Sequence, residues 1–353
     1  MLNLRKRLSK EKQGKLVMVS VKDIAAECNV SVATVSKALN GYRDISEKTR
    51  NRIKVKAAEM GYLPNMAALA LKTSRTYNLG ILFVDAANSG LKHEFFASVL
   101  QGIKAQAEAC GYCITFITNR LGEKEVTYKE YCHNRQFDGV IIACIDFNDP
   151  QVIELINSDI PLVTIDHVFH NTMSVMSDNV KGIRDLMEYL YGMGHRKIAY
   201  IHGDDSSVTQ DRLTSFYQCA ERLGLNIPAE YTAECKYHDT ETAAACTAQL
   251  LDLKERPTCI LYPDDYTAIG GINLIKSRGL NIPEDVSVVG YDGITYASIH
   301  EPAITTLKQD SDAMGREAVL HLINLIEKPK TTLKEKYVVE GSVLIGNSVK
   351  KLN

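Results

Sequence analysis

The sequence predicts a small all-helical head followed by a core of two α/β lobes with parallel sheets. Three helical patterns, each opened by a capping residue, fall within residues 19–63. From residue 77 onward, short apolar strands alternate with amphipathic helices, and this alternation restarts after Ser177. Basic residues are concentrated before residue 76 and acidic residues after it. These observations predict a basic helical domain joined to an acidic two-lobed domain.

The first helical pattern has both start and stop signals. Ser20 is a candidate N-cap, and Asp23, three residues later, completes a capping box. Asn29 tolerates the left-handed conformation of a tight turn, so the helix should end there. One face of this helix is apolar and carries Ile24, Ala25 and Cys28.

Two further helices follow at short intervals. The second begins at Ser31, a capping residue, and ends at Asn40. Val35 and Leu39 are its expected buried stripe. The third helix is expected from Ser46 to Met60, with an apolar face made of Ile53, Ala57 and Met60. Two helices joined by a turn of about 3–4 residues are typical of a helix-turn-helix; the alternative is a three-helix subdomain without a nucleic-acid role.

Charge favours the nucleic-acid interpretation of this head. Residues 1–75 contain 16 Lys and Arg against 6 Asp and Glu, whereas residues 76–353 contain 25 against 37. The whole-chain charge of −2 therefore hides a basic head on an acidic core. A concentrated basic surface attracts the phosphate backbone, because the release of condensed counterions supplies affinity that does not depend on base sequence.

At these residues the chain resembles the LacI/GalR (lactose-repressor-type) family of bacterial transcription regulators. The matching motifs are V-S-V-K-D-I-A, N-V-S-V-A-T-V-S-K-A-L-N-G, S-E-K-T-R and G-Y-L-P-N, and the spacing runs without a gap from Val19 to Thr73. The resemblance covers nearly all of residues 19–348. It implies a regulator, most often a repressor, that binds double-stranded operator DNA as a homodimer and is switched by a small effector.

The second helix supplies the candidate base-reading residues. Lys37 occupies the place where relatives commonly carry Arg, and as a point donor it should prefer a purine. Val32 and Ala33 are small and apolar, which suits a thymine methyl or a van der Waals fit. The other candidate DNA contacts are Ser31, Thr34 and Ser36, which are better placed for phosphates, and Asn40.

Residues 64–76 form the expected hinge helix and linker. Pro64 marks the end of the head, and a helix over residues 66–72 is too short to be stable alone in water. In the family, two such helices pair in a dimer and a Leu wedges between base steps in the minor groove; the match places that wedge at Leu71. The alternative is a helix packed on the core. In many relatives Arg stands at the position of Leu69.

Residues 1–18 are polar and basic without an apolar period, which predicts a disordered arm. The alternative is that Met18 is the true start, because the family match begins just after it. No apolar run approaches the roughly 20 residues of a membrane span, and residues 1–18 show no signal-peptide core. We therefore expect a bacterial cytoplasmic, nucleoid-associated protein with no membrane partner.

The core is expected over residues 77–353. The resemblance divides it into lobe 1, about 77–176 and 309–331, and lobe 2, about 177–308 and 332–348, with chain crossings near Met176, Lys308 and Thr331. Within it, the pattern predicts a helix over residues 124–134 and one final strand over residues 336–346. In open α/β sheets, ligands bind beyond the carboxyl ends of the strands.

Acidic residues follow several of the predicted strands, and one Arg opens a helix beside them. They are Asp85, Asp166, Asp204, Asp264, Asp265 and Asp292, with Arg212. Carboxylates and a planar guanidinium suit the hydroxyl groups of a polyol. For any single Asp, the alternative is a cap on the helix that follows.

The resemblance narrows this set, since the family's effector-binding core is similar to periplasmic sugar-binding proteins. Position by position, it implies effector contacts at Asp166, Arg212, Asp264, Asp292 and Gln309. The segment 85–96 is longer than the common S-N-P-F-F pattern and lines the first lobe's side of the cleft. We add Asp85 and Phe96 to the site, with core packing of Phe95 or Phe96 as the alternative. The implied effector is a mono- or oligosaccharide.

Two other functions compete with regulation. A sugar-binding transport receptor would share the core but needs export. An enzyme such as a sugar kinase is disfavoured, because no phosphate-cradling Gly-rich loop follows a strand and His195 is better explained at a helix end. Nine scattered Cys predict reduced thiols, and the C-x-x-C of Cys110 and Cys113 lacks a second pair, so we expect neither a metal nor a cofactor.

Overall fold

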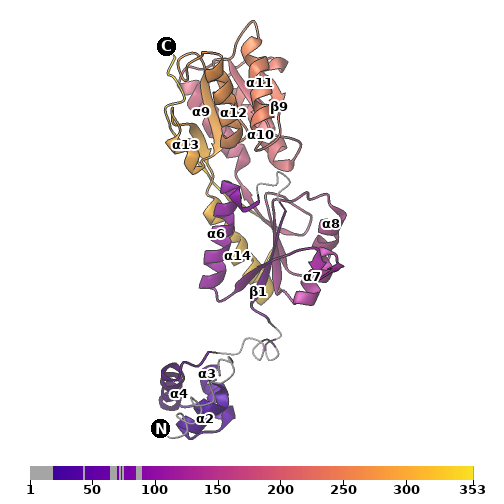
Figure 1. Cartoon of the computed structure of the whole chain (residues 1–353), viewed down its shortest axis with the longest axis vertical. Coiled ribbons are helices and arrows are strands. Elements are labelled where there is room, and N and C mark those ends of the chain that lie inside the picture. The colour runs from indigo at the N-terminus through magenta and orange to yellow at the C-terminus, as the bar shows by residue number, and fades with distance from the viewer. Residues whose placement is uncertain are drawn as a thin grey trace. The chain divides into compact units, whose positions relative to one another are not determined.

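The computed structural model describes residues 19–42, 44–63, 70, 73, 75–84 and 90–352, and the chain divides into two compact units after Thr76 (Figure 1). The predicted arm over residues 1–18 and most of the predicted hinge helix, including Leu71, lie outside the described residues. Asp85 lies outside them as well. None of the described helices combines the length and the hydropathy of a membrane-spanning segment.

The first unit contains the three expected helices, α2 (Val21–Cys28), α3 (Val32–Leu39) and α4 (Glu47–Glu59). The predicted capping box is confirmed: Asp23 N donates to Ser20 Oγ over 3.4 Å, and Ser20 N donates to Asp23 Oδ2 over 2.9 Å. Asn29 ends α2 with φ 50° and ψ 49°, the left-handed conformation expected of it. Short-range capping therefore sets the ends of these helices.

A small apolar core holds the three helices together. The predicted α2 face is confirmed, since Ile24, Ala25 and Cys28 are buried. On α3 the buried residues are Val35 and Ala38, whereas Leu39, which we expected in this stripe, is only partly buried. An i, i+3 pair fits a narrow contact between short helices. From α4 the core receives the buried Ile53 and Ala57 and the partly buried Met60.

The second unit contains two six-stranded sheets and a short hairpin, β3 (Arg120–Leu121) with β4 (Lys124–Glu125). The first sheet has the order β13 (Lys336–Val339), β7 (Met173–Ser177), β6 (Leu162–Ile165), β5 (Gly139–Ala143), β1 (Asn78–Phe83), β2 (Cys113–Phe116). The second has the order β14 (Ser342–Leu344), β12 (Thr305–Lys308), β11 (Ser287–Asp292), β10 (Cys259–Leu261), β8 (Ile198–His202), β9 (Thr232–Glu234).

The two sheets repeat one topology. In each, the first strand along the chain lies between the second and the third, and the later strands follow in order. All pairings are parallel except that between β14 and β12. This doubly wound arrangement confirms the predicted two similar lobes, and it places ligand sites at the carboxyl ends of the strands. We call the part of the second unit that contains the first sheet lobe 1, and the part that contains the second sheet lobe 2.

Helices cover both faces of each sheet (Figure 1). Lobe 1 contains η1 (Gly90–Lys92), α6 (Glu94–Ala109), α7 (Tyr128–Arg135), α8 (Pro150–Ile156) and α14 (Ser311–Glu327). Its core lies in two layers, one against α6 and α14 and one against α7 and α8. Lobe 2 contains α9 (Asn179–Gly192), α10 (Ser207–Arg222), η2 (Ala229–Tyr231), α11 (Thr240–Asp252), α12 (Asp265–Ser277) and α13 (Thr295–Ile299). Its layers lie against α9 and α10 and against α11 and α12.

Two predicted elements were wrong in detail. The helix expected over residues 124–134 begins at Tyr128, because Thr127 caps it through a capping box with Glu130 and residues 124–125 form β4. The single strand expected over residues 336–346 is two strands on different sheets. Consequently the third crossing falls between Val339 and Ser342, not near Thr331, and residues 332–339 do not belong to lobe 2.

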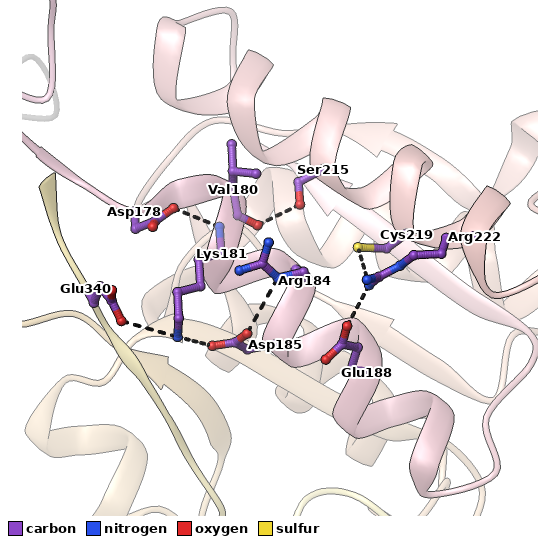
Figure 2. Close-up of polar contacts among 10 residues, drawn as sticks. All are labelled: Asp178, Val180, Lys181, Arg184, Asp185, Glu188, Ser215, Cys219, Arg222 and Glu340. Atoms are coloured by element: carbon purple, nitrogen blue, oxygen red, sulfur yellow. Dashed lines mark hydrogen bonds and ion pairs between the residues drawn. The ribbon is translucent and has the colours of Figure 1, made fainter.

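The crossing segments contact one another and the first helix of lobe 2. Asp178 N, at the first crossing, donates to Val339 O over 2.9 Å at the third. Figure 2 shows Lys181 of α9 between Asp185 and Glu340, with its Nζ 2.6 Å from Asp185 Oδ2 and 3.6 Å from Glu340 Oε2. Glu340 lies on the third crossing, so these contacts fix the crossing strands to lobe 2.

Candidate DNA-reading face and effector site

The outer face of α3 carries the residues predicted to read DNA. Val32 is 45% exposed, Ala33 and Lys37 are also exposed, and Thr34 and Ser36 are half-buried. Ser31 caps the helix, accepting a hydrogen bond from Thr34 N over 3.0 Å. Asn40 Nδ2 donates to Ser36 O over 2.6 Å, so one of its donors already closes the end of the helix.

Lys37 forms an ion pair with Asp44, in the loop between α3 and α4. Both side chains are about half exposed, 47% and 52%. The hydrogen bond to Asp44 raises the pKa of Lys37, and the same contact lowers the pKa of Asp44. Arg50 braces this loop, because its Nη2 donates to Tyr42 O over 3.0 Å and to Ile45 O over 3.1 Å. The position of this acidic residue facing α3 was not predicted from the sequence.

In the second unit, Arg212 is the centre of a buried polar cluster. It lies on α10 and is 4% exposed. Its Nε donates to Asn179 Oδ1 over 2.7 Å, and its Nη1 donates to Pro263 O over 2.9 Å. The guanidinium carbon lies 3.6 Å from the centroid of the Tyr291 ring. Three elements of lobe 2 therefore hold one planar cation in place.

Asp292 and Gln309 lie beside this cation at the ends of β11 and β12. Gln309 Nε2 donates to Asp292 Oδ1 over 2.6 Å, and Gln309 N donates to Asp292 O over 3.1 Å. Asp292 has φ 105°, a left-handed conformation that is rare for a residue with a side chain. Burial raises its pKa well above the usual range, and Arg212 opposes that rise.

Asp166 brings lobe 1 to the same cluster. It follows β6 with φ 59°, and its Oδ1 accepts a hydrogen bond from Ser177 N over 3.3 Å. Burial raises its pKa to about 6, and the charge of Arg212 in lobe 2 works against that rise. Ser207 Oγ of lobe 2 donates to Asp166 O over 3.4 Å. Hence four of the predicted site residues lie together where the lobes meet: Asp166, Arg212, Asp292 and Gln309.

Asp264 is held differently. It is the N-cap of α12, with Oδ1 accepting from Thr267 N over 2.7 Å and Oδ2 accepting from His238 N over 3.1 Å. The helix-cap alternative therefore applies to Asp264. It does not apply to Asp204, because Ser206 caps α10. The neighbouring Asp265 is fully buried, and burial raises its pKa to about 7.

Phe95 and Phe96 differ in burial, and the sequence alone did not show which of them packs in the core. Phe95 is buried in the lobe 1 core, whereas Phe96 is half-buried at its edge. The Phe96 ring lies 5.7 Å from Phe83 and 4.8 Å from His93, measured between ring centroids. Thus Phe95 packs in the core, as expected for one of the two, and the ring of Phe96 lies near the carboxyl end of β1.

Both regions are similar to known protein families. Residues 20–65 match the family described as "Bacterial regulatory proteins, lacI family", and residues 187–349 match "Periplasmic binding protein-like domain". The probable transcriptional repressor ExuR of Bacillus subtilis (strain 168) is 29% identical over 340 residues, covering 95% of this chain and 99% of that protein. The head is therefore a LacI-family helix-turn-helix domain, and the core is periplasmic-binding-protein-like.

Solved structures of LacI-family regulators match most of the chain. The lac repressor dimer bound to operator and the anti-inducer ONPF matches with a TM-score of 0.74 and 26% identity, covering 94% of this chain and 99% of that one. A complex of the regulator CelR with cellobiose matches with a TM-score of 0.69 and 25% identity over the same shares. The predicted fold class is thereby confirmed.

Some residues of the cluster escaped sequence reasoning. Tyr200, Tyr237 and Tyr291 surround Arg212, and burial raises the pKa of each of them. Their only sequence signal is position: Tyr200 and Tyr291 lie in strands whose ends carry the predicted acids. His195 has the structural role that we expected, since its ring Nδ1 lies 2.9 Å from Thr258 Oγ1 and its ring Nε2 lies 3.0 Å from Lys350 O.

Proposed function

We propose that this protein is a transcriptional repressor that reads its operator with α3 and is switched by a small polyhydroxylated effector bound between the lobes. The cluster around Arg212 carries the proposal. Among the residues that the structure describes, four buried polar atoms near it have no hydrogen-bond partner: Asn179 Nδ2, Tyr200 Oη, Tyr291 Oη and Gln309 Oε1. Such atoms cost free energy unless water or a ligand satisfies them, and the hydroxyl groups of a sugar can do so.

The chemistry of this cluster favours a neutral sugar as the effector. Asp166 and Asp292 offer acceptors, and Arg212 keeps donors of its fork that no described residue uses. Hydroxyl groups both donate and accept, so a mono- or oligosaccharide matches both kinds of group. We assign effector contacts to Asp166, Arg212, Asp292 and Gln309, and we keep Asp85, Phe96 and Asp264 as further candidates. The cellobiose complex of CelR supports this class.

The head supplies the DNA contacts in this proposal. Lys37, Val32 and Ala33 read base edges, while Ser31, Thr34, Ser36 and Asn40 contact the backbone or close the helix beside it. Leu71 of the hinge segment is the proposed minor-groove wedge. A two-fold operator requires paired heads, so we propose a homodimer that acts on chromosomal DNA in the bacterial cytoplasm.

A transport receptor is the second candidate, because it would share the two-lobed core. The specific match of residues 20–65 to a regulator's head disfavours it. We also infer a sensor rather than an enzyme, since the cluster's one cation is held by neutral partners and its acids lie beside it without a nucleophile aligned among the described groups.

The proposal is tested in two steps. Full-length protein is first used to select genomic fragments in gel shifts, and a thermal-shift screen of mono- and oligosaccharides then looks for stabilising ligands. A hit should change operator affinity, and operator should change the affinity for that hit by the same factor, because coupling free energies are reciprocal. Stabilisation by nucleosides or purines and not by sugars would replace the effector class. Failure to select any fragment would contradict the regulator itself.

A further inference from the structure

The start of α6 contacts lobe 2 at two separate loops. The ring of His93, just before α6, lies 3.7 Å from the ring of His238 between their centroids. The next residue, Glu94, accepts a hydrogen bond through Oε1 from Thr295 N over 2.5 Å. His238 precedes α11 and Thr295 opens α13, so residues adjacent in lobe 1 join two distant segments of lobe 2.

Two adjacent buried carboxylates hold those two loops. Asp264 Oδ2 accepts from His238 N over 3.1 Å, and His238 has φ 58°, a left-handed conformation that this hydrogen bond supports. Asp265 Oδ2 accepts from Ile294 N over 2.9 Å, one residue before Thr295. Both carboxylates are at most 1% exposed. The first turn of α12 therefore positions both parts of lobe 2 that meet α6.

On the other side, α6 is held rigidly within lobe 1. It crosses α14 at two glycines: a Cβ at Gly102 would lie 2.1 Å from Asp312 O, and one at Gly315 would lie 2.1 Å from Val99 O. Beyond the far end of α6, Cys113 N donates to Tyr77 O over 2.8 Å, and the Tyr112 ring lies 5.3 Å from that of Tyr77. Tyr77 is the first residue of the second unit, where the linker joins it.

We propose that His93 and Glu94 form an interlobe latch, with Asp264 and Asp265 as positioning residues. The latch stabilises the arrangement of the two lobes in this structure. Any change in how the lobes are arranged must break or reform the latch contacts. Because α6 runs from the latch to Ala109, shortly before the Tyr112 and Cys113 contacts with Tyr77, the latch couples lobe arrangement to the linker. The latch stands on the contacts alone; its regulatory meaning rests on the proposed function.

A single substitution removes one latch contact and little else. Thr295→Pro deletes the N–H that Glu94 accepts, and proline is favoured at the first position of a helix, where Thr295 stands. The preceding residue, Ile294, has φ −64° and ψ 156°, which suits a residue before proline. The matched control is Thr295→Ala, which changes the same exposed side chain and keeps the N–H.

The test is hydrogen–deuterium exchange of the full chain, followed by mass spectrometry. If the two contacts act as one latch, Thr295→Pro speeds amide exchange in the peptide that contains His238 by roughly 3- to 30-fold, because losing one contact frees the other. Thr295→Ala leaves that peptide within about 2-fold of the parent protein. Exchange in β10 and the melting temperature report whether either variant has simply lost its fold.

A second substitution removes the other latch contact. His238→Asn removes the ring and keeps a residue that tolerates positive φ, and it should speed exchange around Thr295. If each variant changes only its own peptide, the contacts are independent and the latch is wrong. Absence of DNA binding by the parent protein would contradict the proposed function and leave this exchange result standing, so the two failures are distinguishable.

Discussion

Lys37 in the head and Arg212 in the core are the central cations of two differently built regions. Lys37 is about half exposed and pairs with an equally exposed Asp44. Arg212 is 4% exposed, and a side-chain amide, a backbone carbonyl and an aromatic ring fix its guanidinium. Water screens the first cation and leaves it free to change partners, whereas burial makes the position of the second depend on every neighbour.

This difference indicates how each region works. In the proposed function, Lys37 exchanges Asp44 for phosphates or base edges, so the affinity of the head for DNA should depend steeply on salt. The core needs a fixed pattern of donors and acceptors, so it should depend on geometry and on protonation of its buried acids. Removing the charge of Lys37 and removing the charge of Arg212 should therefore have different effects.

The largest expected effect is on stability when the buried cation is removed. Arg212→Met leaves the half-buried Asp166 and Asp292 beside no positive charge and should cost about 3–5 kcal/mol in the free energy of unfolding at pH 8. At pH 5 the cost should shrink, because both carboxyls can then be neutral. Denaturant unfolding at the two pH values measures this. A loss below about 1 kcal/mol at pH 8 would show that the cluster is not electrostatically coupled.

Asp265 provides the second comparison, through pH. Burial raises its pKa to about 7 in the folded chain, from a usual value near 3.8, so the folded state binds the proton more tightly than the unfolded state. This group's contribution to stability is then greatest below about pH 4 and is lost as the pH rises through about 7, by on the order of 4 kcal/mol.

Asp265→Asn keeps an oxygen for Ile294 N and removes the titration. Its unfolding free energy should fall less between pH 4 and pH 7 than that of the parent chain, as measured by denaturant unfolding across that range. Equal slopes for the two proteins would mean that Asp265 is ionised in the folded state throughout.

Within the head, two valines on α3 distinguish the residues that stabilise the fold from those on the proposed DNA-reading face. Val35 is fully buried and Val32 is 45% exposed, so Val35→Ala should cost about 1–3 kcal/mol in the stability of the head, while Val32→Ala should leave it unchanged. Exchange rates of α2 and α4 amides measure both. Similar destabilisation by both substitutions would place Val32 in the core rather than on the reading face.

The smallest structural change concerns the exposed cation. Lys37→Ala should leave the melting temperature unchanged, since the pair with Asp44 is solvated, and should weaken binding to a selected operator by roughly 5- to 50-fold. Competition gel shifts with single-base operator variants should show relaxed discrimination at one base pair. An equal loss for every variant would reassign Lys37 to a phosphate.

Sequence reasoning succeeded where structure is local. The Ser20–Asp23 capping box and the end of α2 at Asn29 were predicted as observed, because capping acts over a few residues. The two strands within residues 336–346 were missed, because one apolar run serves two sheets and only long-range pairing divides it.

The same limit applies to the candidate site. Asp166, Arg212, Asp292 and Gln309 could be found from strand ends and family motifs, and the structure brings them together. The contact of His93 with His238 could not be found, since it joins two loops 145 positions apart in the sequence. Neither could the pairing of Lys37 with Asp44, which depends on how Arg50 braces the intervening loop.

The most direct test of the account measures duplex DNA affinity as a function of salt, for the full chain and for a chain lacking residues 1–75. We expect that the logarithm of the binding constant of the full chain falls linearly with the logarithm of salt concentration, and that the shortened chain, which keeps the acidic core, shows no measurable binding. Retention of DNA by the shortened chain, or salt-independent binding by the full chain, would contradict it.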